Sequence, residues 1–313
     1  MRNLRDIFLY DETDSMNLEL DVVRECIMDG NFGSAFNHVK GLVREELGWL
    51  PKDNSKRFLY RFVGFPPTRR GKDISENEII KDIRDGRITL SNPMTFNDPM
   101  DPLIRVWAEE QSLRRRSEHD FEIMAKLINA AMNSFRIGCL AHEKESTLWG
   151  LEPPLSPYQN TLMWGHYAKS HTGVCIKYRI TPEMLDAHTD SERILFLGDV
   201  RYRHRKELGD DISLDNSLLA KSNSWEYENE TRMIYFTTLR KDLRYRNGRN
   251  RNYVPLTGFE VQEVYMGYKI KDDYKQAIKD AISGTNISLY QMSFDRNDIT
   301  RLVANRVNSN ITG

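Results

Sequence analysis

The chain has 313 residues, of which 39% are hydrophobic and 29% are charged, a composition that excludes a membrane-embedded protein and an intrinsically disordered one. Its 45 Lys and Arg residues nearly balance its 46 Asp and Glu residues, so only a local patch would bind nucleic acid or a membrane. Cys26, Cys139 and Cys175 lie far apart, which disfavours a disulfide framework, and no apolar stretch reaches the ~20 residues of a membrane span. We therefore expect a cytoplasmic protein without membrane contact.

The first part of the chain is expected to form a helical prefix. Apolar residues recur at helical spacing from Leu18 to Leu47, and the polar segment 50–57 interrupts this pattern. The aromatic segment 58–65 then has the composition of a β-strand. These features predict a helical prefix over residues 1–56 and a main domain over residues 57–313.

The main domain is expected to mix helices and strands. Ser75 and Glu78 predict a capping box, and Gly86 predicts the end of the same helix. The string 92–102, rich in Pro, Asn and Asp, predicts an ordered irregular loop. Periodicity predicts further helices over 117–134, 161–171 and 271–283, and strands over 87–92, 135–142, 173–180, 194–203, 231–239, 261–270 and 287–294. Because strands and helices do not alternate regularly, the sequence favours an α+β fold.

Four short segments combine aromatic with ionisable residues, and we call them the four islands. Glycine-rich nucleotide-binding motifs, HExxH and GxSxG are absent, which disfavours Walker ATPases, Rossmann oxidoreductases and zincins. The islands are LYRF (59–62), SNPMTFNDPMD (91–101), MWGHYAKSHTGVCIKY (163–178) and WEYENETR (225–232). Any chemistry of the chain is expected to depend on these segments.

The fourth island contains two glutamates, Glu228 and Glu230, that are two residues apart. On an extended segment they would point to one face, and Arg232 would continue that row. Two carboxylates on one face can divide roles, because like charges close together raise one of the two pKa values. The alternative is a solvated charged strand face balanced by Arg232.

The third island contains His166 and His171 beside aromatic residues. A metal site would have to join these histidines to Cys175, but the spacing matches no standard zinc pattern, so we predict no metal. The alternative is that Trp164 and Tyr167 pack as core aromatics while a histidine satisfies a backbone carbonyl.

The first two islands each contain a candidate ligand contact. Arg61 lies between Tyr60 and Phe62, so strand alternation places it on the opposite face, where it is either exposed or paired. Asn97 and Asp98 either cap a turn or belong to a ligand-contacting loop.

The four islands, in this order, resemble a widespread bacterial family of uncharacterised domains whose members read LYKYR, SsPssFNDPFD, mWsHYAdnHkGfcI and WxYExEwR. The resemblance covers roughly residues 58–270. At a further remove the layout looks like the ADP-ribosyltransferase superfamily, with a polar residue between aromatics on the first strand, a middle Ser or Tyr motif and a late ExE.

This second resemblance implies a split two-sheet core with flanking helices and NAD held in the cleft between the sheets. Glu230 would be the catalytic glutamate that supports the oxocarbenium-like charge as nicotinamide leaves, and Glu228 would guide the acceptor. Arg61 would contact the NAD phosphates or the nicotinamide ribose, and His166 completes the predicted catalytic set. The predicted NAD-binding residues are Tyr60, Arg61, Ser91, Asn97, Asp98, Trp164 and Tyr167.

A basic strip over residues 240–251 predicts the acceptor. It holds six basic residues against one acid, so it can follow phosphates while Tyr245 stacks on an exposed base, or it is a solvated loop. The predicted nucleic-acid contacts are Arg244, Tyr245, Arg246, Arg249 and Arg251.

Bacterial transferases of this superfamily are often toxins, which implies a toxin–antitoxin or phage-defence effector that modifies single-stranded nucleic acid and is restrained by an antitoxin or chaperone protein. Two alternatives stay open. The first is a metal-dependent nuclease effector, in which Asp98, Asp101, Glu228 and Glu230 would bind magnesium. The second is a non-catalytic module that binds nucleic acid or protein.

Overall fold

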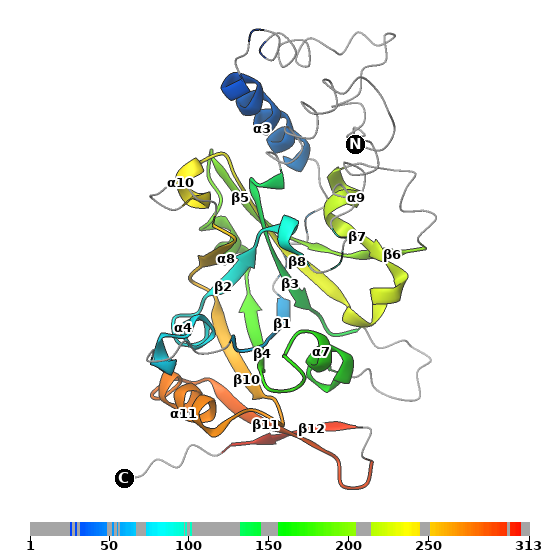
Figure 1. Cartoon of the computed structure of the whole chain (residues 1–313), viewed down its shortest axis with the longest axis vertical. Coiled ribbons are helices and arrows are strands. Elements are labelled where there is room, and N and C mark those ends of the chain that lie inside the picture. Colours follow the sequence, from blue (N-terminus) through cyan, green and yellow to red (C-terminus); the bar gives the residue numbers. More distant parts are fainter. Residues whose placement is uncertain are drawn as a thin grey trace.

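A computed structural model describes most of the main domain and part of the N-terminal segment. The described residues are 26, 29, 32–48, 52, 55, 57–66, 73–96, 98, 101, 132–144, 156–204, 214–244, 251–298 and 301–307. The predicted helix over 117–134 lies outside the described residues, apart from its last three positions. The described part is a mixed α/β structure built on an open, mostly antiparallel sheet (Figure 1).

Twelve strands are described, and their order in the main sheet is β12-β11-β10-β4-β1-β3-β2-β9, with β8 pairing with both β3 and β5. A separate pair joins β6 to β7. The bounds are β1 Arg57–Val63, β2 Ile88–Ser91, β3 Phe135–Ala141, β4 Val174–Ile180, β5 Arg193–Asp199, β6 Arg201–Arg203, β7 Ala220–Ser222, β8 Glu230–Thr237, β9 Tyr253–Leu256, β10 Glu260–Met266, β11 Ser288–Phe294 and β12 Leu302–Arg306.

The described helices are short, apart from α3 and α11. The α-helices are α3 Phe32–Gly48, α4 Glu78–Arg84, α7 Thr161–His166, α8 Pro182–Asp186, α9 Leu214–Leu219, α10 Arg240–Leu243 and α11 Asp272–Ala281. The 3₁₀-helices are η1 Ile74–Glu76, η2 Pro93–Thr95, η3 Pro157–Gln159 and η4 Asn223–Glu228. None of the helices in the described residues is long and apolar enough to cross a membrane.

The sheet divides into two arms at β1 and β3. One arm pairs β1 with β4 and β4 with β10, and the other pairs β3 with β8 and β8 with β5, all antiparallel. The arms meet where Tyr60 of β1 pairs with Ala141 of β3, and β2 reaches β3 through Ser91 and Ile137. Because this pairing is so short, β1 and β3 diverge, and the side chains along both strands border a common space.

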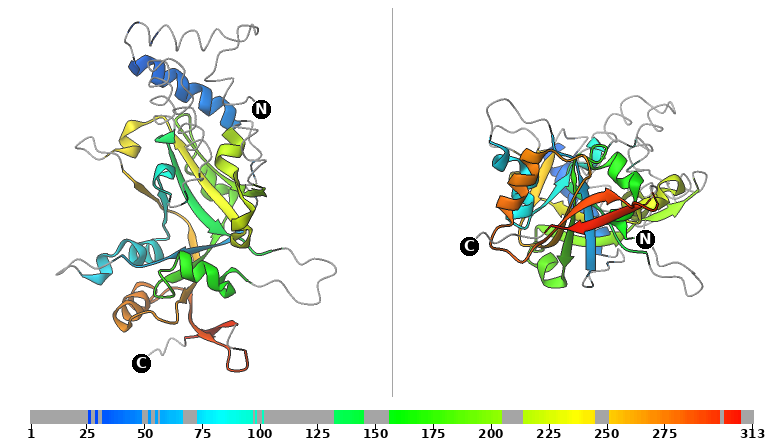
Figure 2. Two further views of the ribbon diagram at one scale, coloured as in Figure 1. Left: turned by 45° about the vertical axis from the view of Figure 1, so that its right-hand side comes forward. Right: turned by 90° about the horizontal axis from the view of Figure 1, so that it is seen from below.

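Both faces of the first arm are covered. On one face, isoleucines of α4 and residues of α11 pack against the strands, and Figures 1 and 2 show these two helices next to each other. On the other face, Tyr60 and Phe62 pack with Trp164 of α7. The predicted alternation of β1 is confirmed, since Tyr60 and Phe62 share a face that Arg61 does not.

Three local details differ from the prediction or refine it. The cap of α4 is Asn77, whose side chain accepts from the amide of Ile79, because Ser75 is already inside η1. The helix α7 ends at His166 rather than near residue 171, since Lys169–His171 adopt positive φ. The prefix contains α3, whose Lys40 donates to the carbonyl of Thr238, and the division of the chain at residue 56 stays a prediction.

Candidate functional site

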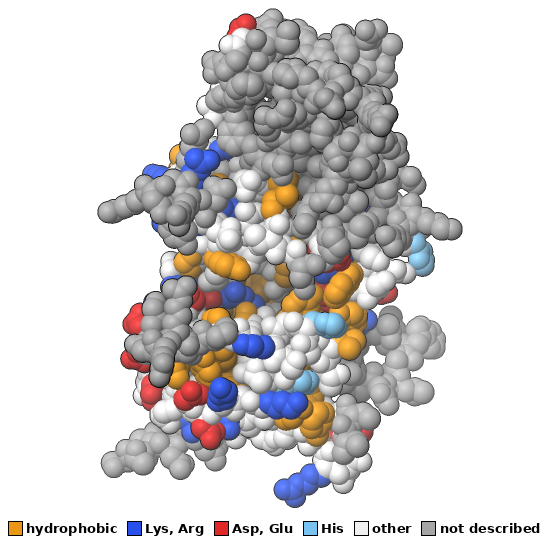
Figure 3. Space-filling model, viewed as in Figure 1, with side chains coloured by type: hydrophobic (Ala, Val, Ile, Leu, Met, Phe, Trp, Pro, Cys, Tyr) orange, Lys and Arg blue, Asp and Glu red, His pale blue; other side chains and the backbone are white. Residues whose placement is uncertain are grey.

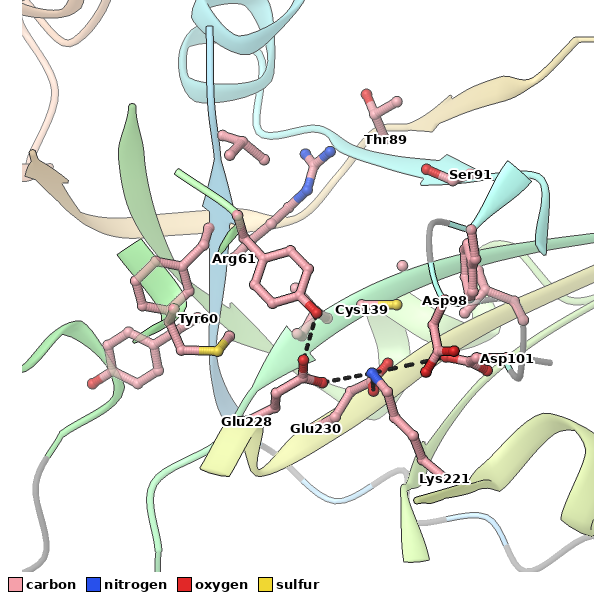
Figure 4. A pocket seen from close by; sticks show the side chains of 18 residues that line it. Tyr60, Arg61, Thr89, Ser91, Asp98, Asp101, Cys139, Lys221, Glu228 and Glu230 are labelled. Carbon is pink, nitrogen blue, oxygen red and sulfur yellow. Dashed lines mark hydrogen bonds and ion pairs between the residues drawn. The ribbon is translucent and has the colours of Figure 1, made fainter. Parts of the chain in front are cut away.

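A cavity of about 230 Å³ opens where the two arms of the sheet diverge (Figure 4). All four islands contribute to its walls, although they are spread over more than 160 positions of sequence. The lining residues are Tyr60, Arg61, Phe62, Val63, Thr89, Ser91, Phe96, Asp98, Asp101, Ile137, Gly138, Cys139, Leu140, Met163, Tyr167, Lys221, Glu228 and Glu230. We call this space the central cavity.

The two glutamates of the fourth island form one wall of the central cavity. Glu228 ends η4 and Glu230 begins β8, so the segment between them is not extended as predicted. Asn229 adopts a left-handed conformation (φ 44°, ψ 58°), which turns the chain and still brings both carboxylates to Lys221. The prediction of a shared orientation is therefore confirmed, for a different backbone reason.

Lys221 links the carboxylates of this wall. Its Nζ lies 2.6 Å from Oε2 of Glu228, 3.1 Å from Oε2 of Glu230 and 3.8 Å from Oδ2 of Asp101. Glu228 also accepts from the hydroxyl of Tyr167. Lys221 belongs to β7, outside the four islands, and nothing in its sequence context marked it.

Arg232 completes the buried cluster behind the cavity wall. Its Nε donates to Oε1 of Glu230 over 2.9 Å, and its Nη2 donates to Oδ2 of Asp101 over 2.6 Å. Arg232 is fully buried and Glu230 is only 2% exposed, so the alternative of a solvated charged strand face is wrong. These five residues, Asp101, Lys221, Glu228, Glu230 and Arg232, are the charge cluster.

Burial and neighbouring charges shift the pKa values of the cluster in opposite directions. Burial alone would raise the pKa of Glu230, but Arg232 and Lys221 outweigh it and hold that pKa well below its usual range. Burial raises the pKa of Glu228 and that of Asp101 despite their cationic neighbours. Two nearby glutamates thus differ in proton affinity, the arrangement that separates acid from base roles in active sites.

Arg61 lines the central cavity apart from the charge cluster. Its Nη1 donates to Oδ2 of Asp82 over 2.8 Å, and Figure 4 shows its guanidinium extending toward Thr89. Asp82 is 1% exposed and also accepts from Arg87 and Thr89. Of the two possibilities for Arg61, pairing is confirmed, and its anion comes from the chain itself.

The other predicted site residues fall into two groups. Tyr60, Ser91, Asp98 and Tyr167 line the central cavity. Trp164 does not, because it is fully buried in the core, where its Nε1 donates to the carbonyl of Tyr158 over 2.7 Å.

His166 also lies outside the cavity lining. It is exposed at the end of α7, with its ring 6.0 Å from that of Trp225 and 6.3 Å from that of Tyr227. Near the middle of the face in Figure 3, acidic and basic side chains lie beside hydrophobic and histidine side chains.

Only parts of the basic strip and of the second island can be placed. Asn97, Tyr245, Arg246 and Arg249 lie outside the described residues. Arg244 is exposed after α10, at the end of β8 opposite Glu230. The strip ends at Arg251, and the next residues return to β2, where Tyr253 pairs with Ser91.

Besides Lys221, two further cavity residues with polar or thiol side chains, Cys139 and Thr89, lie outside the four islands. Cys139 is the one exposed residue of β3, and it lines the cavity. Thr89 donates its hydroxyl to Asp82 on β2. Neither residue stands in a pattern that differs from an ordinary strand. Within the described residues, no group of three or more His, Cys, Asp or Glu side chains has an arrangement that could hold a metal ion.

Comparison with known proteins gives one match. The model of a family described as "Protein of unknown function (DUF2971)" matches residues 163–233, which include all of the third island and all of the fourth. The matched segment thus contains Tyr167, Lys221, Glu228, Glu230 and Arg232. No curated protein and no solved structure matches the chain.

Proposed function

We propose that the protein is an NAD-dependent mono-ADP-ribosyltransferase with its active site in the central cavity and an ADP-ribosyltransferase-like split sheet. The observation that carries the proposal is the convergence of the four islands on one cavity, with the glutamate pair on one wall and Arg61 on another. Buried ionisable groups with opposed pKa shifts around a cavity are typical of functional sites.

Glu230 suits the role of the catalytic glutamate. The reaction that NAD undergoes in such enzymes develops positive charge on the nicotinamide ribose as the bond to nicotinamide breaks. A carboxylate kept ionised by Arg232 and Lys221 is well prepared to stabilise that charge, because it needs no reorganisation. Each Glu230 oxygen accepts one bond from these cations, which leaves lone pairs for a ribose hydroxyl.

The residues around the cavity fit one end of the dinucleotide. A volume of about 230 Å³ lies below the ~300–1,000 Å³ typical of ligand pockets, so the cavity would take the nicotinamide and its ribose and leave the adenylate end outside. The half-buried ring of Tyr167 offers a stacking surface. Arg61, held by Asp82, would orient the neighbouring phosphate.

The acceptor in this proposal is single-stranded nucleic acid, and the protein acts as a toxin or defence effector with a restraining partner. Support comes from the charge of the basic strip and from the residues that follow it, which return to β2, where Tyr253 pairs with Ser91 at the cavity. A strand bound at Arg251 would therefore lie near the Ser91 wall of the cavity.

A magnesium-dependent nuclease is less well supported. The ammonium of Lys221 lies within 4 Å of Asp101, Glu228 and Glu230, so it takes the position among these carboxylates that a divalent cation would need. A purely structural role is also less well supported, because buried charge clusters are rarely more stabilising than apolar packing.

The proposal is tested with Glu230→Gln, which keeps the side-chain shape and removes the charge. We expect NAD turnover to fall by about a hundredfold or more, the scale of one lost electrostatic contact in a transition state. Glu226→Gln is the matched control, because Glu226 is exposed on η4 of the same island. The assay follows the turnover of labelled NAD in the presence of a chelator. Unchanged turnover in folded Glu230→Gln would refute the assignment of Glu230 as the catalytic glutamate.

A further inference from the structure

The charge cluster is not electrically balanced. Its three carboxylates, Asp101, Glu228 and Glu230, are at most 4% exposed, and its two cations, Lys221 and Arg232, are at most 6% exposed. When all three carboxyl groups are ionised, one negative charge therefore has no cation inside the cluster. A buried charge of this kind is costly unless a partner is supplied, and the cavity is the side from which a partner can come.

Asp101 carries the acceptor that lacks a donor. Its Oδ2 accepts from Arg232 over 2.6 Å, whereas its Oδ1 is buried and has no hydrogen-bond partner among the described residues. The side chain is 4% exposed and lines the central cavity. A buried carboxylate oxygen without a donor loses its hydration and gains nothing in return, so the site is complete only with a donor in the cavity.

The remaining wall favours a flat organic group over a metal ion. Two half-buried aromatic residues, Phe96 and Tyr167, belong to the cavity lining, and aromatic rings attract cations over their faces. Arg61 lies apart from the charge cluster and pairs with Asp82. Lys221 already lies among the carboxylates, which leaves Oδ1 of Asp101 as the acceptor for a ligand.

We propose that the central cavity is a binding site for a planar organic cation with N–H donors, of the amidinium or guanidinium class, which donates to Oδ1 of Asp101. This inference goes beyond the proposed ADP-ribosyl transfer. It concerns which group the cavity selects, and it holds or fails whether or not NAD binds.

The test compares benzamidine with benzamide on the full chain by calorimetry. The two probes have nearly the same shape, but benzamidine is a cation at neutral pH and benzamide is neutral. We expect benzamidine to bind at least about tenfold more tightly, the effect of one charge-assisted hydrogen bond in a buried site. Equal affinities, or no binding of benzamidine, would overturn the proposal, as would displacement of benzamidine by stoichiometric magnesium.

Two variants test whether Asp101 causes the preference for benzamidine over benzamide. Asp101→Asn keeps one oxygen for Arg232 and replaces the other acceptor with a donor, so it should abolish the preference for benzamidine. Glu226→Gln removes an exposed charge on η4, outside the cavity lining, and should retain the preference. A retained preference in Asp101→Asn would refute the role of Asp101. If that variant does not fold, a crystal structure of the wild-type protein with benzamidine decides, because the amidinium must lie within hydrogen-bond distance of Oδ1.

Discussion

Replacing Lys221 by Met isolates the electrostatic balance of the charge cluster. The substitution keeps most of the side-chain volume but removes the ammonium that lies 2.6 Å from Glu228 and 3.1 Å from Glu230. Three buried carboxylates would then share Arg232 as their cation within the cluster. Loss of one partner from a buried ion pair costs about 3–5 kcal/mol, a large part of the ~5–15 kcal/mol that stabilises a typical domain.

The unfolding free energy lost in Lys221→Met should depend on pH. Burial already raises the pKa of Glu228 in the wild-type protein, and removal of Lys221 raises it further. A carboxyl whose folded-state pKa exceeds its unfolded-state pKa destabilises the folded protein as pH rises through the folded-state value. The difference in unfolding free energy between wild type and Lys221→Met should therefore be smaller at pH 5 than at pH 8.

Urea unfolding followed by tryptophan fluorescence measures this difference. Lys241→Met, an exposed substitution on α10, is the matched control and should stay within about 0.5 kcal/mol of wild type. Adding Glu228→Gln to Lys221→Met should recover part of the lost unfolding free energy. The two carboxylates that remain in the cluster, Asp101 and Glu230, both accept hydrogen bonds from Arg232. The reasoning fails if Lys221→Met resembles the control, or if the second substitution deepens the loss.

Three further outcomes are expected. Gly173→Ala should unfold the protein or lower its stability by several kcal/mol, because a Cβ there would lie 2.1 Å from the carbonyl oxygen of Val63. The control Gly165→Ala in α7 should be neutral or slightly stabilising, because its Cβ meets nothing within 4 Å. Similar melting temperatures for both variants would contradict this packing. Arg61→Ala should weaken NAD binding about tenfold or more in calorimetry. It should cost little stability, since Asp82 keeps Arg87 and Thr89 as partners. Wild-type NAD affinity would exclude the phosphate role of Arg61. The four arginines of the basic strip to be replaced by Gln are Arg244, Arg246, Arg249 and Arg251. This variant should bind a single-stranded oligonucleotide more weakly and with a flatter salt dependence, while its NAD affinity stays unchanged. Labelling of the oligonucleotide at the wild-type rate would exclude the strip as the acceptor site.

Local sequence patterns determined most of the secondary structure and the location of the site. Short segments rich in aromatic and β-branched residues predicted β1, β3, β4, β8 and β10, because such side chains favour strands. Dense mixtures of aromatic and ionisable residues marked the four islands, and these segments line one cavity. Local patterns were weaker at helix ends, where Asn77 rather than Ser75 caps α4.

The tertiary structure decided the electrostatics of the site. Lys221 pairs with Asp101, which lies 120 positions earlier, and Arg61 pairs with Asp82 on a helix that covers another part of the sheet. Such pairings depend on which strands become neighbours, and no local periodicity encodes a contact between a lysine on β7 and a carboxylate after η2. The sequence alone therefore marked four of the segments that line the cavity. Only the folded chain added Lys221 and the residues of β3 to that lining, and it left one oxygen of Asp101 without a donor among the described residues.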